Sequence, residues 1–542
     1  MDKNRYQNIL PYDATRVILT SAHKKQSDYI NASWINGYRK EKSYVTCQGP
    51  LPETIGDFWR MVWELKIPTI VMLTKTVEAN RVKCEQYWPK RVGETVSVDN
   101  DRLIVLLNEV VPFADYELRK TTIYFGEEKR DIVHYYFQSW PDHGVPRYAT
   151  ALLGFIRNVR KSHFPSDPAP LLVHCSAGVG RTGTLIVLDI MLQVLEAQAG
   201  INVYHSILKL RRQRCSMVQT EAQYTFIHDA LEELITCGKT EISAMNLRIA
   251  MKRLGAPDTE TEATGFQKQF ELLEQVTRQP QKKDVEISQR IVNMGKNRYP
   301  DMLPYDFQRV CLRLTGQPGS DYINGSWING YRQSNAFMVT QAPLDNTVND
   351  LWRMVWESGS KTIVMLNDLQ DDMAQYWPEP QKKQVYGSLT VSSKTEDGVD
   401  DTLCTRAFEI YRNGSVASPL QEVRTVTQFH LRGWPRDGLP SQPSLLLDLV
   451  DRVLKKQRST GNKPVTVMCS NGSGASGVFV VLYSQLERLK TEHVLDVFQG
   501  IKAARTQRMG IVHNAECYKL IHQLLLEFLT SFQDKNYDNF RE

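Results

Sequence analysis

The chain has 542 residues, which is too long for one ordinary hydrophobic core and fits two large domains or roughly three to four smaller ones. Hydrophobic residues make up 42% and charged residues 23%, so the composition excludes wholesale disorder. The net charge is only +5 and no basic block is present, which argues against nucleic-acid binding. The nine cysteines include no C-x-x-C pair, which indicates a reducing compartment and no structural zinc or other metal site.

An internal duplication organises the chain. The segment DYINASWINGYR at 28–39 recurs as DYINGSWINGYR at 321–332, which is 293 residues later. A solenoid unit repeats every ~20–50 residues, so a period this long indicates a duplicated domain. We therefore expect a first domain, a linker, a second domain and a flexible tail at 1–237, 238–264, 265–530 and 531–542.

Strand and helix patterns mix within each half, which indicates an α/β fold. Short apolar runs at 69–73 and 171–174 are typical of buried strands, and the apolar segment 184–196 is long enough for a buried helix. Strand, glycine-rich turn and helix thus follow one another over 171–196. Turn amides and a helix N-terminus converge on one spot in such a unit, which predicts an anion-binding site.

Between the halves, the polar and turn-rich stretch 255–264 predicts a connector. Phe266, Phe270 and Leu273 then fall on one face of a helix. We expect this helix to pack on its own domain.

The turn of the first half reads VHCSAGVGRTG over 173–183. Cys175 sits in the positive field of the turn amides and the helix dipole, which favours the thiolate, the nucleophilic form. Arg181 can fold back and grip two oxygens of a tetrahedral dianion with its planar fork. A buried cysteine is usually a small hydrophobe, but cysteine, glycines and arginine placed together after a strand weaken that alternative.

Residues 175–181 match the C-x5-R signature of the protein tyrosine phosphatases, in the form of their phosphotyrosine-specific branch. Other motifs that resemble the family stand in order: KNRY at 3–6, DYINAS at 28–33, QGP at 48–50, WPDHG at 140–144 and QTEAQ at 219–223. The tandem arrangement resembles receptor-type members. The resemblance covers nearly the whole chain and implies two phosphatase domains, each a central mixed sheet flanked by helices, with no cofactor or metal.

The resemblance also implies roles for individual residues. Cys175 would attack phosphorus and form a phosphocysteine, while Arg181 and the loop amides hold the phosphoryl oxygens. Asp142 would protonate the leaving tyrosyl oxygen, although a lone Asp after Trp-Pro is usually a turn residue. Gln219 and Gln223 resemble the pair that positions the hydrolytic water.

Further roles concern the walls of the pocket. Thr182 resembles the hydroxyl that steadies the thiolate, and Tyr6 resembles the aromatic wall that makes the cleft deep enough to select phosphotyrosine. Two interpretations of His174 are equally consistent with the sequence: it supports the site, or it is a structural histidine. The expected substrate-binding residues are Tyr6, Asn8, Ser176, Ala177, Gly178, Val179 and Gly180.

The second half keeps the cysteine of this loop but loses its partners. Ala475 stands where the first half has Arg181, and Arg436 stands where it has Asp142. Losing a preorganised donor costs roughly 10²–10³ in rate and losing a general acid roughly 10²–10⁴, so we expect a pseudophosphatase with a regulatory or partner-binding role. The degenerate positions are Cys469, Ala475, Arg436, His513 and Cys517.

Partners and location follow from the same resemblance. Phosphotyrosine proteins are the expected substrates, and Tyr537 in the tail has the Tyr-x-Asn form that adaptor SH2 domains favour once phosphorylated. The alternative is that Tyr537 packs on the domain or does nothing. No apolar run approaches the ~20 residues that span a bilayer. Almost nothing precedes Asn4, so we expect a soluble fragment that lacks the leading helices of its first domain and comes from a membrane-anchored receptor, on the cytoplasmic side of the plasma membrane.

Two other functions compete with a phosphotyrosine phosphatase. A binding protein that traps phosphotyrosine would not need Asp142, which is present. A lipid or dual-specificity phosphatase would not need the deep pocket that Tyr6 and the segment 219–223 imply.

Overall fold

The structure is a computed structural model. It describes residues 2–20, 27–99, 101–163, 168–277, 281–314, 320–369, 373–399, 402–413, 422–436 and 438–538. The chain divides into two compact units, Met1–Gly238 and Lys239–Glu542. Among the described residues, no helix combines the length and the apolar character needed to cross a membrane.

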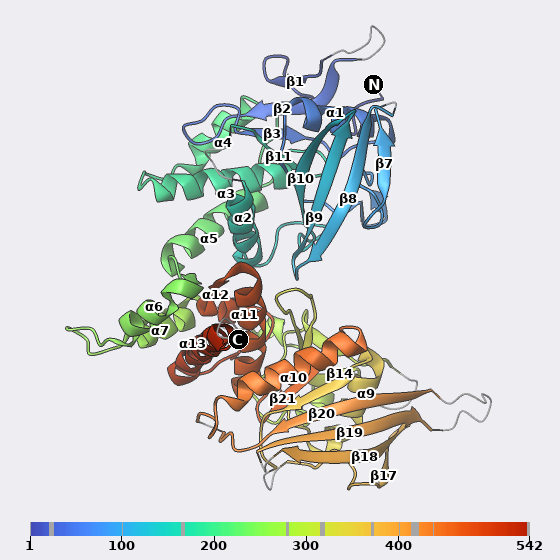
Figure 1. Ribbon diagram of the computed structural model, residues 1–542, viewed down its shortest axis with the longest axis vertical. Coiled ribbons are helices and arrows are strands. Elements are labelled where there is room, and N and C mark those ends of the chain that lie inside the picture. The colour runs from blue at the N-terminus through green and yellow to red at the C-terminus, as the bar shows by residue number, and fades with distance from the viewer. Residues whose placement is uncertain are drawn as a thin grey trace. The chain divides into compact units, whose positions relative to one another are not determined.

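The first unit is built on a nine-stranded mixed sheet, which confirms the expected fold class (Figure 1). The four central strands β3, β11, β4 and β10 run parallel, and the outer strands pair antiparallel. In spatial order the strands are β1 (Arg16–Ile18), β2 (Tyr29–Ile35), β3 (Tyr44–Cys47), β11 (Leu171–His174), β4 (Thr69–Met72), β10 (Glu128–Phe137), β9 (Tyr116–Phe125), β8 (Leu103–Pro112) and β7 (Thr95–Val98).

Helices cover both faces of this sheet. Along β11, Leu171 and Val173 join one hydrophobic cluster and Leu172 joins the other, as expected for a strand buried on both sides. The sequence-based expectation of strands at 69–73 and 171–174 is confirmed. The helices are α1 (Ile55–Glu64), α2 (Thr150–Ser162), α3 (Gly180–Glu196), α4 (Val203–Arg211) and α5 (Glu221–Cys237), and the hairpin strands β5 (Val77–Glu78) and β6 (Arg81–Val82) stand apart from the main sheet.

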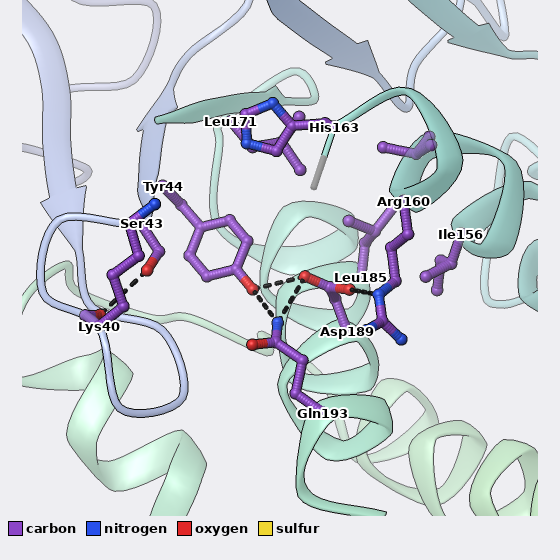
Figure 2. A pocket seen from close by; sticks show the side chains of 11 residues that line it. Lys40, Ser43, Tyr44, Ile156, Arg160, His163, Leu171, Leu185, Asp189 and Gln193 are labelled. Carbon is purple, nitrogen blue, oxygen red and sulfur yellow. Dashed lines mark hydrogen bonds and ion pairs between the residues drawn. The ribbon is translucent and has the colours of Figure 1, made fainter. Parts of the chain in front are cut away.

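Helix α3 begins at Gly180, four residues before the predicted start, and is tied to the sheet by a buried polar network. The Tyr44 hydroxyl and the Gln193 amide donate to one oxygen of Asp189, at 2.5 and 3.3 Å. Arg160 lies 3.4 Å from the other oxygen (Figure 2). Burial raises the pKa of the Asp189 carboxyl. The network fixes β3, α2 and α3 to one another, and α3 carries the candidate site at its first turn.

The second unit repeats the same strand order, so the sequence duplication is a duplication of the fold. Its strands in spatial order are β13 (Arg309–Cys311), β14 (Tyr322–Ile328), β15 (Phe337–Gln341), β21 (Val465–Cys469), β16 (Thr362–Met365), β20 (Val423–Leu431), β19 (Leu403–Arg412), β18 (Leu389–Val399) and β17 (Lys383–Tyr386). Its helices include α9 (Val348–Ser358), α10 (Leu445–Thr460), α11 (Gly474–Glu492), α12 (Val497–Arg505) and α13 (Ala515–Asp538).

The segment 238–264 is folded into the second unit over part of its length, where we expected a linker. Strand β12 (Ile242–Ser243) pairs with β22 (Val494–Leu495), and α6 (Leu247–Gly255) buries Leu247 and Leu254. The segment is polar and turn-rich only from 255 on. Its earlier part folds because it pairs and packs with residues far along the chain, which local sequence patterns do not show.

Two further expectations concern the ends of the second unit. Helix α7 (Gly265–Val276) buries Phe266 and Phe270 against Tyr518 of α13, as predicted. Helix α13 continues through the expected flexible tail as far as Asp538, because no Gly or Pro interrupts it after its buried first turns. Residues 539–542 lie outside the described residues.

Candidate active site

The loop after β11 turns sharply toward the first turn of α3. Cys175 opens this loop and is only 5% exposed. Gly178 has φ +71°, and a Cβ atom at this position would lie 2.0 Å from the carbonyl oxygen of Cys47. Only glycine fits there, which lets the loop pack directly on the end of β3.

A fully buried arginine, Arg214, holds the outer side of this loop. Its side chain donates to the carbonyl oxygens of Gly178 and Ala177, at 2.9 and 3.1 Å, and to Asn31 at 2.8 Å. Because these carbonyl groups face Arg214, the neighbouring N–H groups are free to face the other way. Sequence reasoning missed Arg214; the signal was its recurrence as Arg508, which makes the same contacts in the second unit.

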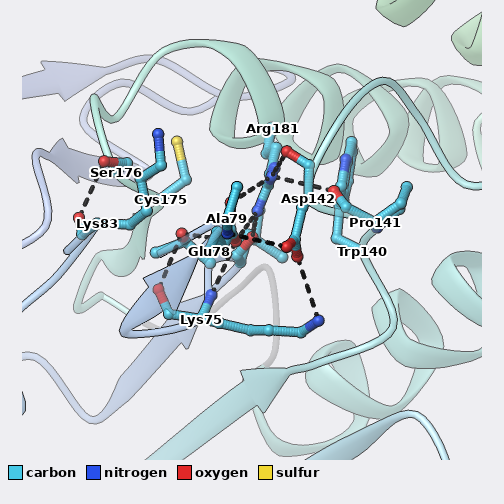
Figure 3. A network of polar contacts seen from close by, with 12 residues as sticks. Lys75, Glu78, Ala79, Lys83, Trp140, Pro141, Asp142, Cys175, Ser176 and Arg181 are labelled. Atoms are coloured by element: carbon cyan, nitrogen blue, oxygen red, sulfur yellow. Dashed lines mark hydrogen bonds and ion pairs between the residues drawn. The ribbon is translucent and has the colours of Figure 1, made fainter. Parts of the chain in front are cut away.

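Arg181 is held in position by a carboxylate that sequence reasoning also missed. Its two terminal nitrogens donate to the two oxygens of Glu78, at 2.6 and 2.9 Å (Figure 3). Glu78 is 3% exposed and also accepts from the Thr74 hydroxyl and the Lys75 amide, both at 3.0 Å. Arg181 Nη1 also donates to the carbonyl oxygen of Leu73 at 3.0 Å, so both terminal nitrogens are engaged within the protein and the plane of the guanidinium is fixed.

Asp142 lies beside this pair but does not point at Cys175. Its carboxylate accepts from the backbone N–H of Ala79 at 3.1 Å and from Lys75 at 3.3 Å, and Figure 3 shows it directed at these two partners. The Ala79 N–H, aided by Lys75, lowers the pKa of Asp142. Arg181 donates to the carbonyl oxygen of Pro141 at 3.2 Å, so the segment that carries Asp142 is held by Arg181.

The side chains of Gln219 and Gln223 lie against the loop at Gly180. A Cβ atom on Gly180 would meet the side-chain amides of Gln223 at 2.9 Å and Gln219 at 3.3 Å. Thr182 is fully buried, yet within the described part of the chain its hydroxyl has no hydrogen-bond partner. The expectation that Thr182 steadies the thiolate of Cys175 stays a prediction.

Tyr6 reaches the loop through its hydroxyl. Ser176 donates to the carbonyl oxygen of Lys83 at 2.9 Å and so accepts from Tyr6 Oη, also at 2.9 Å. Tyr6 thus stands at the rim of the loop, where a pocket wall was expected. Asn8, which was also expected to bind substrate, is exposed.

His174 supports the loop from beneath. It is completely buried, with Nε2 2.8 Å from Tyr87 Oη and Nδ1 3.2 Å from the carbonyl oxygen of Cys175. Burial lowers its pKa to about 4, so the ring is neutral at neutral pH.

The second unit places the degenerate residues at the equivalent site. Cys469 ends β21 and is 4% exposed, while Ala475 in the first turn of α11 provides no guanidinium. The guanidinium carbon of Arg436 lies 4.8 Å from the ring centroid of Tyr299. The ring of His513 lies against Gly474, and Cys517 is buried, with burial raising its pKa to about 12.

Comparison with known proteins gives the class. The family model "Protein-tyrosine phosphatase" matches residues 1–233 and 293–527, so the chain belongs to this family, with two tandem domains. Among the described residues, no group of three or more His, Cys, Asp or Glu is placed to hold a metal ion.

Individual relatives narrow the comparison to receptor-type proteins. Receptor-type tyrosine-protein phosphatase F of Homo sapiens is 42% identical over 542 residues, which cover 98% of this chain and 28% of the relative. Receptor-type tyrosine-protein phosphatase S of Gallus gallus is 41% identical, covering 98% and 35%. Receptor-type tyrosine-protein phosphatase epsilon of Mus musculus is 41% identical, covering 98% and 76%. The chain thus spans about a third or less of the F and S relatives.

Proposed function

We propose that the first unit hydrolyses phosphotyrosine in proteins through a phosphocysteine intermediate. The observation that carries this proposal is the buried pair of Arg181 and Glu78 beside the loop that Cys175 opens. An anchored guanidinium and converging loop amides supply positive charge where the three phosphoryl oxygens gain negative charge in the transition state. Family membership supports the same chemistry.

The reaction takes place in two displacements. Cys175 Sγ forms a bond to phosphorus while the bond from phosphorus to the tyrosyl oxygen breaks, and Asp142 gives its proton to that oxygen. A water molecule positioned by Gln219 and Gln223 then attacks phosphorus, the P–S bond breaks, and the water proton returns to Asp142. Inorganic phosphate leaves and the thiolate is restored.

Asp142 has to change partners during this cycle. Its contacts with Ala79 and Lys75 stabilise the ionised carboxylate, whereas a general acid works in the protonated form. We therefore infer a resting position for the acid, from which Asp142 swings toward the leaving oxygen when substrate fills the loop. The bond from Arg181 to the Pro141 carbonyl links that movement to the clamp.

The rim of the pocket sets the substrate class. Tyr6 is fixed by its bond to Ser176, and a ring in this position would stack on the ring of phosphotyrosine. A shorter phosphoserine side chain would not reach from that rim to Cys175. Phosphotyrosine proteins are therefore the proposed substrates.

The second unit is proposed to be inactive and to serve regulation or partner binding. Ala475 removes the clamp, and Arg436 replaces the acid with a cation that lies over Tyr299. Either loss alone would cost orders of magnitude in rate.

The test is hydrolysis of a phosphotyrosine peptide panel beside matched phosphoserine peptides. The native chain and Cys469→Ser should cleave the phosphotyrosine peptides equally, and Cys175→Ser should cleave none. Rapid phosphoserine hydrolysis would point to a different substrate class. Activity that survives Cys175→Ser but not Cys469→Ser would overturn the assignment of the two units.

Two proposals concern the protein beyond this chemistry. The receptor-type relatives support a membrane-anchored protein with these domains on the cytoplasmic side of the plasma membrane, which fractionation of the full-length protein would test.

Phosphorylated Tyr537 is proposed to bind an adaptor SH2 domain, although α13 continues through this position. Titration of tail peptides tests this: the phosphorylated form should bind, and Asn539→Ala should weaken it.

A further inference from the structure

The loop of the second unit carries an asparagine, Asn471, at the position of Ala177 in the first. The Oδ1 atom of Asn471 accepts the backbone N–H groups of Ser473 and Gly474, at 2.9 and 3.0 Å. The Cys469 thiol donates to the same oxygen at 3.4 Å. Three donors of the loop thus converge on one side-chain oxygen of the loop itself.

Two of these donors lie at the position equivalent to the loop amides that are proposed to hold the phosphoryl oxygens in the first unit. Ser473 and Gly474 open helix α11, where backbone N–H groups lack partners within the helix and the dipole is positive. Both residues are buried, so their N–H groups need an acceptor inside the protein. In the first unit, the methyl group of Ala177 cannot provide one.

Cys469 is the third donor to Asn471 Oδ1. An amide oxygen only accepts hydrogen bonds, so the Cys469 thiol is the donor in this contact. The nucleophile position of the second unit is therefore used as a donor to Asn471, and its sulfur is turned toward the loop.

A second contact involves Tyr299, the counterpart of Tyr6. Tyr299 keeps the rim position through its bond to Ser470 at 2.8 Å, as Tyr6 does in the first unit. The guanidinium of Arg436 lies over the Tyr299 ring, at 4.8 Å from its centroid. One face of the Tyr299 ring therefore carries a cation from the same unit.

We propose that Asn471 is an internal ligand of the second loop, which takes the coordination of a phosphoryl oxygen and excludes tetrahedral oxyanions. The inference goes beyond the loss of catalytic groups. A loop without arginine could still bind phosphate through its amides, whereas a loop whose amides are already satisfied does not.

Hydrogen exchange of the full chain with tungstate, an unreactive tetrahedral oxyanion, tests this loop by loop. In the native chain, tungstate should slow exchange in peptides that cover 173–183 and leave those that cover 467–477 unchanged. In Asn471→Ala, exchange over 467–477 should be faster without tungstate and slow by about tenfold when it is added. Asn471→Asp keeps an acceptor of the same shape and is the matched control, which should exclude tungstate as the native chain does.

Protection of 467–477 in the native chain, at the concentration that saturates the first loop, would overturn the proposal. So would failure of a folded Asn471→Ala chain to respond, or a response of Asn471→Asp equal to that of Asn471→Ala. If Asn471→Ala does not fold, the native chain and Asn471→Asp still decide. Absence of protection over 173–183 would count against the proposed function of the first unit only.

Discussion

Glu78 accepts both terminal nitrogens of Arg181, and the two bonds, at 2.6 and 2.9 Å, fix the plane of the guanidinium. The short segment 74–79 that contains Glu78 also binds Asp142, through Lys75 and the N–H of Ala79. One loop outside the main sheet therefore positions both Arg181, the proposed phosphate-binding residue, and Asp142, the proposed general acid. Its residues belong to the site although they lie about a hundred residues before the cysteine loop in the sequence.

The first prediction concerns Glu78. Glu78→Ala should lower kcat toward phosphotyrosine peptides by roughly 10²–10³, the cost of losing one preorganised charge donor, because Arg181 is no longer aligned. Glu78→Gln keeps one acceptor oxygen, so its kcat should lie between that of the native chain and that of Glu78→Ala. Steady-state kinetics of the three chains check this, and an unchanged kcat for Glu78→Ala would show that Arg181 finds its position without the carboxylate.

The second prediction concerns the pH dependence of the acid. The Ala79 N–H and Lys75 both favour ionised Asp142 and lower its pKa, and the acid works only when protonated. Lys75→Met removes one of these influences on the resting enzyme, so the pKa of Asp142 should rise and the alkaline limb of the kcat/KM profile should move to higher pH. Lys129→Met, a change of an exposed lysine on β10, is the control. A limb that stays in place would show that the contact with Lys75 does not control the acid.

The third prediction concerns repair of the second unit. In a Cys175→Ser background, Ala475→Arg alone should give no measurable hydrolysis, because Asn471 still occupies the loop amides and Arg436 stands in place of the acid. Adding Asn471→Ala and Arg436→Asp should raise the rate above that of the single variant. Substantial activity of Ala475→Arg alone would mean that the missing arginine is the whole defect.

The sequence predicted the duplicated α/β fold because its motifs recur in the second half, and it predicted the loop from Cys175 to Arg181 because cysteine, glycines and arginine follow a buried strand in one local pattern. It did not predict Glu78, since a single glutamate in the two-residue strand β5 carries no motif and meets Arg181 only through the fold. Asn471 was visible as a substitution, but the direction of its side chain was not. The linker expectation differed for the same reason, since β12 pairs with β22, which is distant in sequence.

The last prediction concerns acid stability of the first unit. His174 has a pKa of about 4 in the fold, against an ordinary value of 6.5, because burial disfavours the charged ring. The unfolded chain therefore binds a proton that the folded chain does not, and stability is lost as pH falls from 6.5 toward 4, by about 3 kcal/mol at most for this group.

The variant His174→Met introduces the residue that the second unit has at Met468. It should lower stability at pH 7 through the lost bond to Tyr87 but flatten this pH dependence. Urea unfolding followed by hydrogen exchange of α3 peptides at pH 7 and pH 5 measures both effects, with the exposed His205→Met as control. An equal loss between the two pH values in the native chain and in His174→Met would show that other groups carry the acid sensitivity.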